Sequence, residues 1–171
     1  MEKNLTLTGM MGVGKTTVGK RLAKKLKFKF IDIDKIIEKN EGQSINSIFK
    51  KKGEVYFRKI EKEITIIELK KTHSIISLGG GAFLNNSIRE LTKKNSISFW
   101  LDASVETLIS RLKKSKNRPV LGKEKTNISI KEIYFERKKF YNQANYRIKC
   151  QKLTLKQIVE KILNLYEKSR N

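Results

Sequence analysis

Hydrophobic and polar positions follow two different spacings along this chain. Short apolar or alternating runs, which are typical of β-strands, occur at residues 5–8, 28–32, 74–78, 97–101 and 144–150. Apolar residues at spacings of three and four, which are typical of amphipathic helices, occur at residues 18–26, 35–71, 88–91, 105–112, 130–141 and 155–166. Strands that alternate with helices predict a parallel sheet covered by helices, in a three-layer α/β domain.

The long helical stretch has internal breaks. Gly42 and Gly53 predict two interruptions, and Ser44 is the expected N-cap of the helix that starts between them. Farther along, Thr154 and Gln157 have the spacing of a capping box. The helix after Gly53 is expected to bury its apolar residues Phe57, Ile60, Ile64 and Ile67.

The segment at residues 9–17, Gly-Met-Met-Gly-Val-Gly-Lys-Thr-Thr, lies between a predicted strand and a predicted helix. Its G-x-x-x-x-G-K-T pattern predicts a phosphate-binding loop. Glycines allow the backbone N–H groups to approach phosphate closely, and the positive end of the next helix adds attraction. Lys15 is expected to reach the β- and γ-phosphates, and the Thr16 hydroxyl to bind Mg²⁺. The chain is therefore predicted to bind a nucleoside triphosphate.

Length and cysteine content limit the class of protein. The 171 residues fit one domain with its own hydrophobic core. The only cysteine, Cys150, excludes an internal disulfide framework. We see no signal-peptide pattern and no apolar run of membrane-spanning length, so a cytoplasmic protein without a membrane partner is expected.

The formal net charge of +22 has two interpretations. One is binding to nucleic acid or another anionic surface. The other is a lysine-rich composition, in which solvated helix faces carry lysine throughout. The basic residues are spread from Lys3 to Arg170 without an aromatic-interleaved run, which favours composition and no nucleic-acid partner. Part of the charge should still attract anionic substrates.

Acidic residues and glycines follow the predicted strands, where ligands bind in parallel α/β sheets. Asp32 and Asp34 end the second strand, Gly79-Gly80-Gly81 follows the third, and Asp102 ends the fourth. One of the first two carboxylates could face a metal and the other an acceptor hydroxyl. The alternative is that Asp34 caps a helix. Asp102 could likewise only cap the helix that follows it.

Three arginines are candidates for binding anions. Arg137 lies on an otherwise apolar helical face, where an unpaired charge would be unfavourable, so it should meet an anion in a cleft or an internal carboxylate. For Arg58, spacing alone predicts a surface pair with Glu61. Arg118 stands beside Pro119 in a polar loop, from which it could close over phosphates and stabilise transition-state charge.

These residues together resemble the shikimate kinase family over nearly the whole chain. The first shared motif, at residues 9–17, marks a large superfamily, whereas the other five in this order are far more specific. They are Phe30-x-Asp32-x-Asp34, Phe57-Arg58-x-x-Glu61, Leu78-Gly79-Gly80-Gly81-Ala82, Arg118-Pro119-Val120-Leu121, and Arg137-x-x-x-Tyr141 followed by Ala144.

The resemblance implies a P-loop NTPase fold of the nucleoside-monophosphate-kinase type, with a five-stranded parallel sheet flanked by helices. It implies ATP-dependent phosphorylation of the 3-hydroxyl of shikimate, with Mg²⁺, on the route to chorismate and aromatic amino acids. Residues 1–171 would form one kinase domain, with a shikimate-binding segment at about 33–62 and a lid at about 113–125. We expect a monomer whose partners are the small molecules shikimate and ATP.

The resemblance also implies roles for individual residues. The catalytic residues would be Lys15, Asp34 and Arg118. Shikimate would contact Asp34, Arg58, Gly80, Gly81 and Arg137. The nucleotide would contact Gly12, Val13, Gly14, Lys15, Thr16, Thr17, Arg111 near adenine, and Arg118. Mg²⁺ would be held by Thr16 and, through water, by Asp32.

One departure from a general phosphate-loop enzyme is that Ser77, not an aspartate, ends the third strand, which leaves more of the metal environment to Asp32. Two alternative functions remain open at this point. A kinase of another small hydroxylated acid, such as gluconate, would keep the loop and the lid but should not need both Arg58 and Arg137. A nucleotide-switched nucleic-acid-binding module would instead show tight binding with a steep salt dependence.

Overall fold

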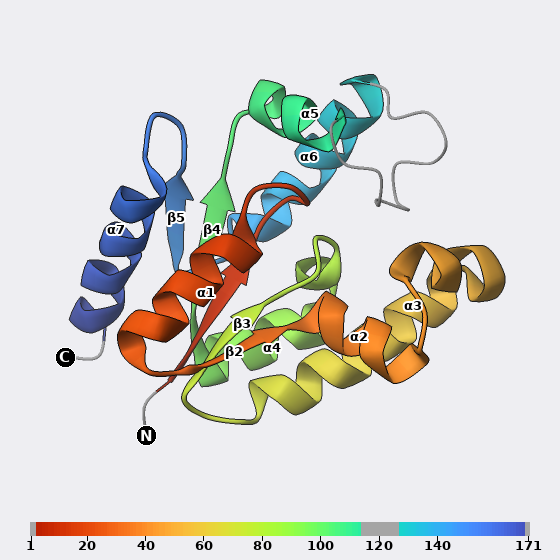
Figure 1. Cartoon of the computed structure of the whole chain (residues 1–171), viewed down its shortest axis with the longest axis horizontal. Coiled ribbons are helices and arrows are strands. Elements are labelled where there is room, and N and C mark those ends of the chain that lie inside the picture. Colours follow the sequence, from red (N-terminus) through yellow and green to blue (C-terminus); the bar gives the residue numbers. More distant parts are fainter. Residues whose placement is uncertain (1–2, 114–126, 170–171) are drawn as a thin grey trace.

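The computed structural model describes residues 3–113 and 127–169, and its strands form a parallel sheet in the order β2-β3-β1-β4-β5 (Figure 1). The strands are β1 (Asn4–Thr8), β2 (Lys29–Asp32), β3 (Ser74–Ser77), β4 (Ser96–Asp102) and β5 (Tyr146–Lys149). Every neighbouring pair is parallel. The predicted five-stranded parallel sheet is confirmed.

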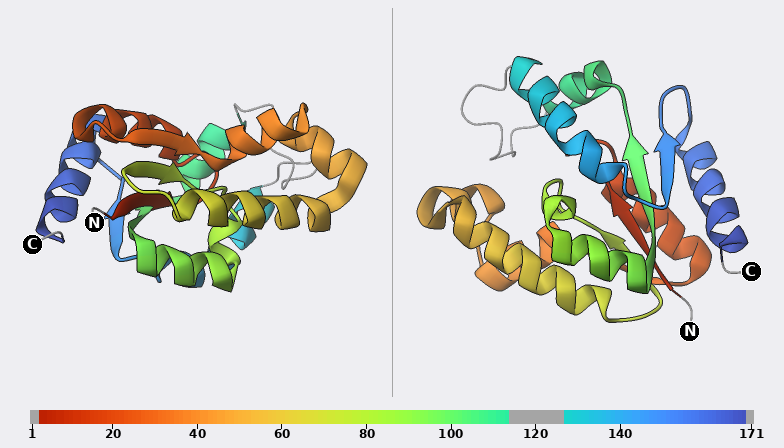
Figure 2. Two further views of the ribbon diagram at one scale, coloured as in Figure 1. Left: turned by 90° about the horizontal axis from the view of Figure 1, so that it is seen from below. Right: turned by 180° about the vertical axis from the view of Figure 1, so that it is seen from behind.

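Helices cover both faces of this sheet. They are α1 (Lys15–Leu26), α2 (Ile33–Glu41), α3 (Ile45–Leu69), α4 (Asn86–Asn95), α5 (Val105–Lys113), α6 (Asn127–Tyr141) and α7 (Leu155–Lys168), with a short 3-10 helix η1 (Ala82–Leu84). Helices α1 and α7 lie on one face, and α3 and α4 lie on the other (Figure 2). Helices α5 and α6 lie together beyond the carboxyl end of β4 (Figure 1).

The two faces of the sheet differ in polarity. On the α1 side, buried leucine and isoleucine side chains of β1 and β3 lie in register, as in the pair Leu5 and Ile75. Gly19 lets α1 approach closely, because a Cβ there would lie 2.4 Å from Phe30 Cε2. On the opposite face, the Thr6 hydroxyl donates to Ser96 Oγ at 2.8 Å. This face therefore buries polar side chains, some of which bond to one another.

The predicted breaks and caps around α2 and α3 are confirmed. Gly42 ends α2 with φ 62°, and the Ser44 side chain accepts from the Ser47 N–H at 3.2 Å to start α3. Gly53 kinks α3 with φ 81° and ψ 171°, which is backbone that favours glycine. The capping box at the start of α7 is also present.

The expectation that Ile67 is buried is wrong, because 57% of this residue is exposed. The buried stripe of α3 instead includes Glu61, Thr65 and Glu68. Glu68 is paired with Lys71 at 2.6 Å, and Glu61 reaches the pocket described below. Buried polar residues thus take the place of one of the expected apolar positions.

The last strand is shorter than the apolar pattern predicts. Asn145 lies before β5, where its side-chain oxygen accepts from the Ser98 N–H at 2.9 Å and its own N–H donates to Ser98 Oγ at 3.0 Å. Side-chain hydrogen bonds therefore take the place of the first ladder bonds.

In the part of the chain that the structure describes, no helix is both long and apolar enough to cross a membrane.

Candidate functional site

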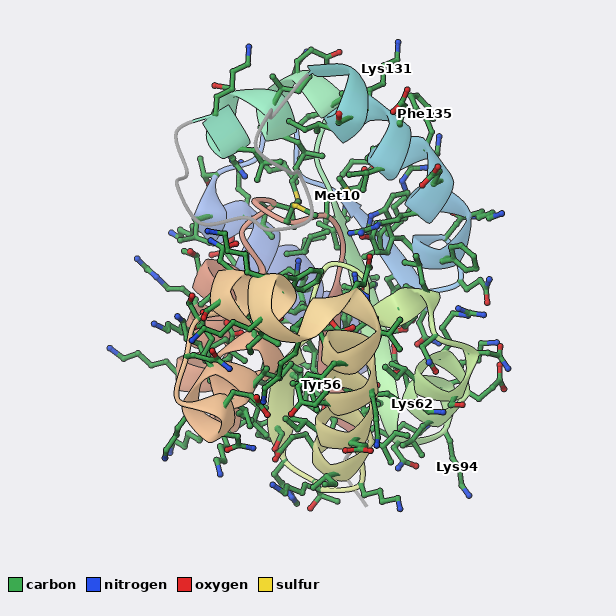
Figure 3. The ribbon with its side chains drawn as sticks, turned by 90° about the vertical axis from the view of Figure 1, so that its right-hand side faces the viewer. Met10, Tyr56, Lys62, Lys94, Lys131 and Phe135 are labelled. Atoms are coloured by element: carbon green, nitrogen blue, oxygen red, sulfur yellow. The ribbon has the colours of Figure 1, made fainter. Side chains whose placement is uncertain are left out.

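A pocket of about 600 Å³ lies at the carboxyl end of the sheet, bordered by the phosphate-binding loop, α2, α3, the glycine loop after β3, and α6. The predicted site residues that line it are Gly12, Gly14, Lys15, Thr16, Thr17, Asp32, Asp34, Arg58, Gly80, Gly81 and Arg137. Met10, in the phosphate-binding loop, lies between the α5–α6 pair and the helices α2 and α3 when the molecule is viewed from the side (Figure 3). The fold thus brings most of the predicted residues to one place.

The phosphate-binding loop has the backbone that its glycines predict. Gly12 and Gly14 have φ values of 78° and 107°, and α1 begins at Lys15. The Lys15 ammonium donates to the backbone carbonyls of Gly9 at 2.8 Å and Met10 at 3.0 Å. These bonds keep the cation within the curve of the loop, close to the N-terminus of α1. The arrangement fits a polyphosphate.

A hydroxyl and a carboxylate lie together next to this loop. The Thr16 hydroxyl donates to Asp32 Oδ2 at 2.7 Å, and Asp32 is paired in the sheet with Ser77. Oxygen ligands of this kind suit Mg²⁺, which is usually bound through one or two carboxylates, several waters and substrate phosphates. The donor set therefore fits the metal that the sequence predicts.

The expected arrangement of the two aspartates needs one correction. Asp32 ends β2 and its carboxylate accepts from the Lys35 N–H at 3.4 Å, so Asp32, not Asp34, is the N-cap of α2. Asp34 lies in the first turn of α2 rather than on an extended segment. Both still line the pocket, since the helix starts where β2 ends.

The glycines after β3 make room for charged side chains. A Cβ at Gly79 would lie 2.3 Å from Glu61 Oε1 and 2.9 Å from Asp34 Oδ1. A Cβ at Gly81 would lie 2.5 Å from Arg58 Nη1. A larger residue at Gly79 or Gly81 would displace these side chains. Glycine at both positions therefore leaves room for Glu61, Asp34 and Arg58.

Arg58 does pair with Glu61, as the spacing predicts, but the pair is not on the surface. Arg58 Nη1 lies 2.7 Å from Glu61 Oε2, and Arg58 Nη2 lies 3.1 Å from Glu54. Glu61 is only 2% exposed. Burial raises the pKa of the Glu61 carboxyl and the charge of Asp34 adds to this, whereas Arg58 opposes it. The pair is an element of the pocket.

Arg137 projects from α6 into the same pocket and is only 6% exposed. Its Nη1 atom lies 3.4 Å from the position that a Cβ of Gly80 would occupy, and it has no hydrogen-bond partner among the described residues. Leaving a buried charged donor unsatisfied is unfavourable. An anionic ligand group in the pocket would supply the missing acceptor, in agreement with the cleft predicted for Arg137.

Among the described residues, the predicted nucleotide contacts Val13 and Arg111 do not line the pocket. Arg111, on α5, donates to the backbone carbonyls of Gly12 at 3.3 Å and Val13 at 3.1 Å, so it braces the phosphate-binding loop from outside. Arg118 and residues 114–125 of the expected lid lie outside the described residues.

The alternative considered for Asp102, that it only caps the helix after β4, does not hold. Ser104 caps α5, since its Oγ accepts from the Thr107 N–H at 3.2 Å. The Asp102 carboxylate instead accepts from the Tyr134 hydroxyl at 2.9 Å and from Arg147 Nη2 at 2.7 Å. These partners are distant in the sequence, and no local pattern indicates them.

Sequence reasoning missed an apolar wall of the pocket formed by Ile45, Phe49 and Phe57. The rings of Phe49 and Phe57 pack with their centroids 4.7 Å apart. The helical spacing of these residues indicated burial, but spacing alone does not distinguish a core position from a position that faces a ligand cavity.

Comparison with known proteins gives a consistent result. The family model described as shikimate kinase matches residues 11–167. A shikimate kinase from Sulfurihydrogenibium sp. (strain YO3AOP1) is 46% identical over 161 residues, which cover 94% of this chain and 96% of the relative. The structure of "Shikimate kinase from Acinetobacter baumannii in complex with shikimate" matches with a TM-score of 0.93 and 34% identity, covering 98% of this chain and 94% of the other.

A gluconokinase from Sinorhizobium meliloti 1021 is a more distant structural neighbour. Its TM-score is 0.56 and its sequence identity is 15%, with 98% of this chain and 93% of the other covered. At this identity the likeness extends to the fold alone.

Proposed function

The chain belongs to the shikimate kinase family, and we propose that the pocket between its phosphate-binding loop and its triple-glycine loop is the site of phosphoryl transfer from ATP to the 3-hydroxyl of shikimate. The observation that carries this assignment is the buried Arg137, whose Nη1 lacks a hydrogen-bond partner among the described residues. Shikimate carries a carboxylate, which is the acceptor that this donor needs.

On the acceptor side, Arg58 and Arg137 hold the shikimate carboxylate through charge-assisted hydrogen bonds. Gly80 and Gly81 contribute backbone close to the ring. Asp34 orients the attacking hydroxyl and accepts its proton as the oxygen bonds to the γ-phosphorus. The bond between the γ-phosphorus and the β–γ bridging oxygen breaks, and ADP leaves.

On the donor side, residues Gly12 to Thr17 hold the phosphates of ATP, and the Lys15 ammonium neutralises charge on the transferred group. Thr16 and, through water, Asp32 would hold Mg²⁺, which neutralises phosphate charge when bound. We propose that Arg118 reaches the phosphates from the lid and that Arg111 lies near adenine. Chemistry then depends mainly on positioning and electrostatic stabilisation.

We further propose the division of residues 1–171 that the resemblance implies: one kinase domain with a shikimate-binding segment at about 33–62 and a lid at about 113–125. Lid closure would exclude water and limit wasteful hydrolysis of ATP. We propose that the protein acts as a monomer in the cytoplasm, where ATP is available. Sedimentation with and without ligands tests the oligomeric state.

An assay of ADP release with ATP and Mg²⁺ tests the proposed function directly. We expect turnover that requires shikimate and is not supported by gluconate, with shikimate 3-phosphate as the product. Turnover with gluconate but not shikimate would overturn the assignment.

A salt titration of DNA and RNA binding tests the alternative of a nucleic-acid-binding module. We expect any such binding to be lost at physiological salt concentration.

A further inference from the structure

Helix α6 is attached to the rest of the protein by two tyrosine hydroxyls, one on each side of Arg137. Tyr134, near the middle of the helix, donates to the Asp102 carboxylate of β4 at 2.9 Å. Tyr141, at the end of the helix, donates to the backbone carbonyl of Gly80 in the glycine loop. Arg137 lies between these two attachments and lines the pocket.

These side chains lie on one face of α6. Spacings of three and four residues place Tyr134, Arg137 and Tyr141 on the same side of a helix. Lys131 and Phe135 lie on the outer side of α6, away from the sheet, and Phe135 is 54% exposed (Figure 3). A small rotation or shift of α6 would therefore move Arg137 relative to the pocket.

The acceptor for Tyr134 is itself held firmly. Arg147, on the neighbouring strand β5, donates to Asp102 Oδ2 through Nε at 3.0 Å and Nη2 at 2.7 Å. The Arg147 guanidinium also lies 4.5 Å from the centre of the Trp100 ring, and Trp100 packs against Tyr141 with centroids 5.9 Å apart. The carboxylate is only 8% exposed. The Asp102 carboxylate is thus held in place on the sheet, and α6 is hydrogen-bonded to it through Tyr134.

The Arg137 Nη1 atom has no hydrogen-bond partner within the described residues, and Tyr141, whose side chain interacts with the guanidinium, belongs to the same helix. The direction of the Arg137 side chain therefore depends on the position of its helix. The pKa of Tyr134 is raised to about 12, mainly by burial and then by Asp102, so the hydroxyl remains a donor at neutral pH. The attachment is present throughout the physiological range.

We propose that Asp102 and Tyr134 are positioning residues for the substrate carboxylate: their hydrogen bond sets the placement of α6 and thereby aims Arg137 into the pocket. This inference rests on the proposed function of Arg137. It assigns a catalytic consequence to a contact that lies outside the pocket and touches neither substrate.

Steady-state kinetics of Tyr134→Phe test the proposal, because this change removes only the hydroxyl. The KM for shikimate should rise on the order of threefold to tenfold, as expected for one lost hydrogen bond, while the KM for ATP stays unchanged. Tyr166→Phe is the matched control: Tyr166 is a buried tyrosine whose hydroxyl donates to the Lys3 carbonyl, away from α6. It should leave both KM values unchanged.

A double-mutant cycle assigns the effect to the hydrogen bond. Asp102→Ala should raise the shikimate KM, and adding Tyr134→Phe to it should cause no further rise. Asp102→Asn keeps a side-chain oxygen acceptor and should be milder than Asp102→Ala. Additive effects of the two changes, or a Tyr134→Phe change that alters both KM values equally, would overturn the proposal.

Arg137→Ala serves as the reference variant. If Arg137→Ala raises the shikimate KM and Tyr134→Phe does not, the positioning role is wrong while the proposed site survives. If Arg137→Ala itself leaves the shikimate KM unchanged, the proposed function of Arg137 fails first. Thermal unfolding of each variant separates these outcomes from a loss of folded protein.

Discussion

Arg58 and Glu61 form an ion pair at 2.7 Å in the wall of the pocket, and the glutamate side chain is only 3% exposed. The second oxygen of Glu61, Oε1, has no hydrogen-bond partner among the described residues. Half of this carboxylate is therefore satisfied, while the other half faces Gly79 without a donor. A buried, partly satisfied carboxylate of this kind should affect stability in a pH-dependent way.

Glu61→Gln should become more stable relative to the wild type as pH rises from about 4 to about 7. Burial raises the folded-state pKa of Glu61 above its ordinary 4.5, so the native protein binds more protons than the unfolded chain. The contribution of Glu61 to the free energy of unfolding is thus full below pH 4.5 and falls as pH rises toward the folded value. Urea unfolding at several pH values measures this.

Glu54→Gln is the control for that experiment, because Glu54 binds the same arginine but its side chain is 61% exposed. It should change the free energy of unfolding less than Glu61→Gln does, since solvent screens the interaction of an exposed carboxylate. A Glu61→Gln difference that stays constant with pH, or that falls as pH rises, would contradict the direction assigned to the Glu61 pKa.

Lys15→Met should abolish phosphoryl transfer while leaving shikimate binding intact. The Lys15 ammonium lies within the curve of the phosphate-binding loop, where it is bonded to the carbonyls of Gly9 and Met10. Turnover and calorimetric titration of shikimate measure the two effects separately. Lys25→Met, at an exposed position of α1, should leave both unchanged; loss of shikimate binding in Lys15→Met would refute the separation of roles.

Gly81→Ala should weaken shikimate binding by roughly tenfold, the effect of one displaced charge-assisted hydrogen bond. The new Cβ would lie 2.5 Å from Arg58 Nη1, so the guanidinium must move. Gly81 has φ −103°, so alanine adds no backbone strain. Gly42→Asn, in open space and at a φ of 62° that asparagine tolerates, is the control. Unchanged shikimate affinity in Gly81→Ala would show that shikimate binding does not depend on the observed position of the Arg58 guanidinium.

Arg111→Ala should raise the KM for ATP several-fold without changing the KM for shikimate. The guanidinium donates to two carbonyls of the phosphate-binding loop, and its loss should loosen the loop that receives the nucleotide, by about the value of one or two hydrogen bonds. Fluorescent-nucleotide displacement gives the same comparison at equilibrium. An equal loss for both substrates would instead indicate a general loss of structure.

The sequence predicted those features that depend on local patterns. The phosphate-binding loop, the kink at Gly53, the caps at Ser44 and Thr154, and the parallel sheet follow from glycine positions, capping residues and apolar spacing. The placement of Arg137 could also be inferred, because one charge on an apolar helical face needs an anion.

Other features depend on contacts between distant segments and could not be predicted in this way. Apolar spacing alone predicted that Ile67 is buried. In the structure Glu61 and Glu68 are buried on α3 instead, and each is paired with a cation, which apolar spacing does not indicate. The role of Asp102 depends on Tyr134 and Arg147, which the fold brings to the end of β4.

A crystal structure with ADP and shikimate bound is the sharpest test of the proposed site. We expect the ring carboxylate to contact Arg58 and Arg137, Asp34 to bond the 3-hydroxyl, and this hydroxyl to point toward the nucleotide phosphates. A ring bound elsewhere, with Asp34 and both arginines free of contact, would contradict this expectation.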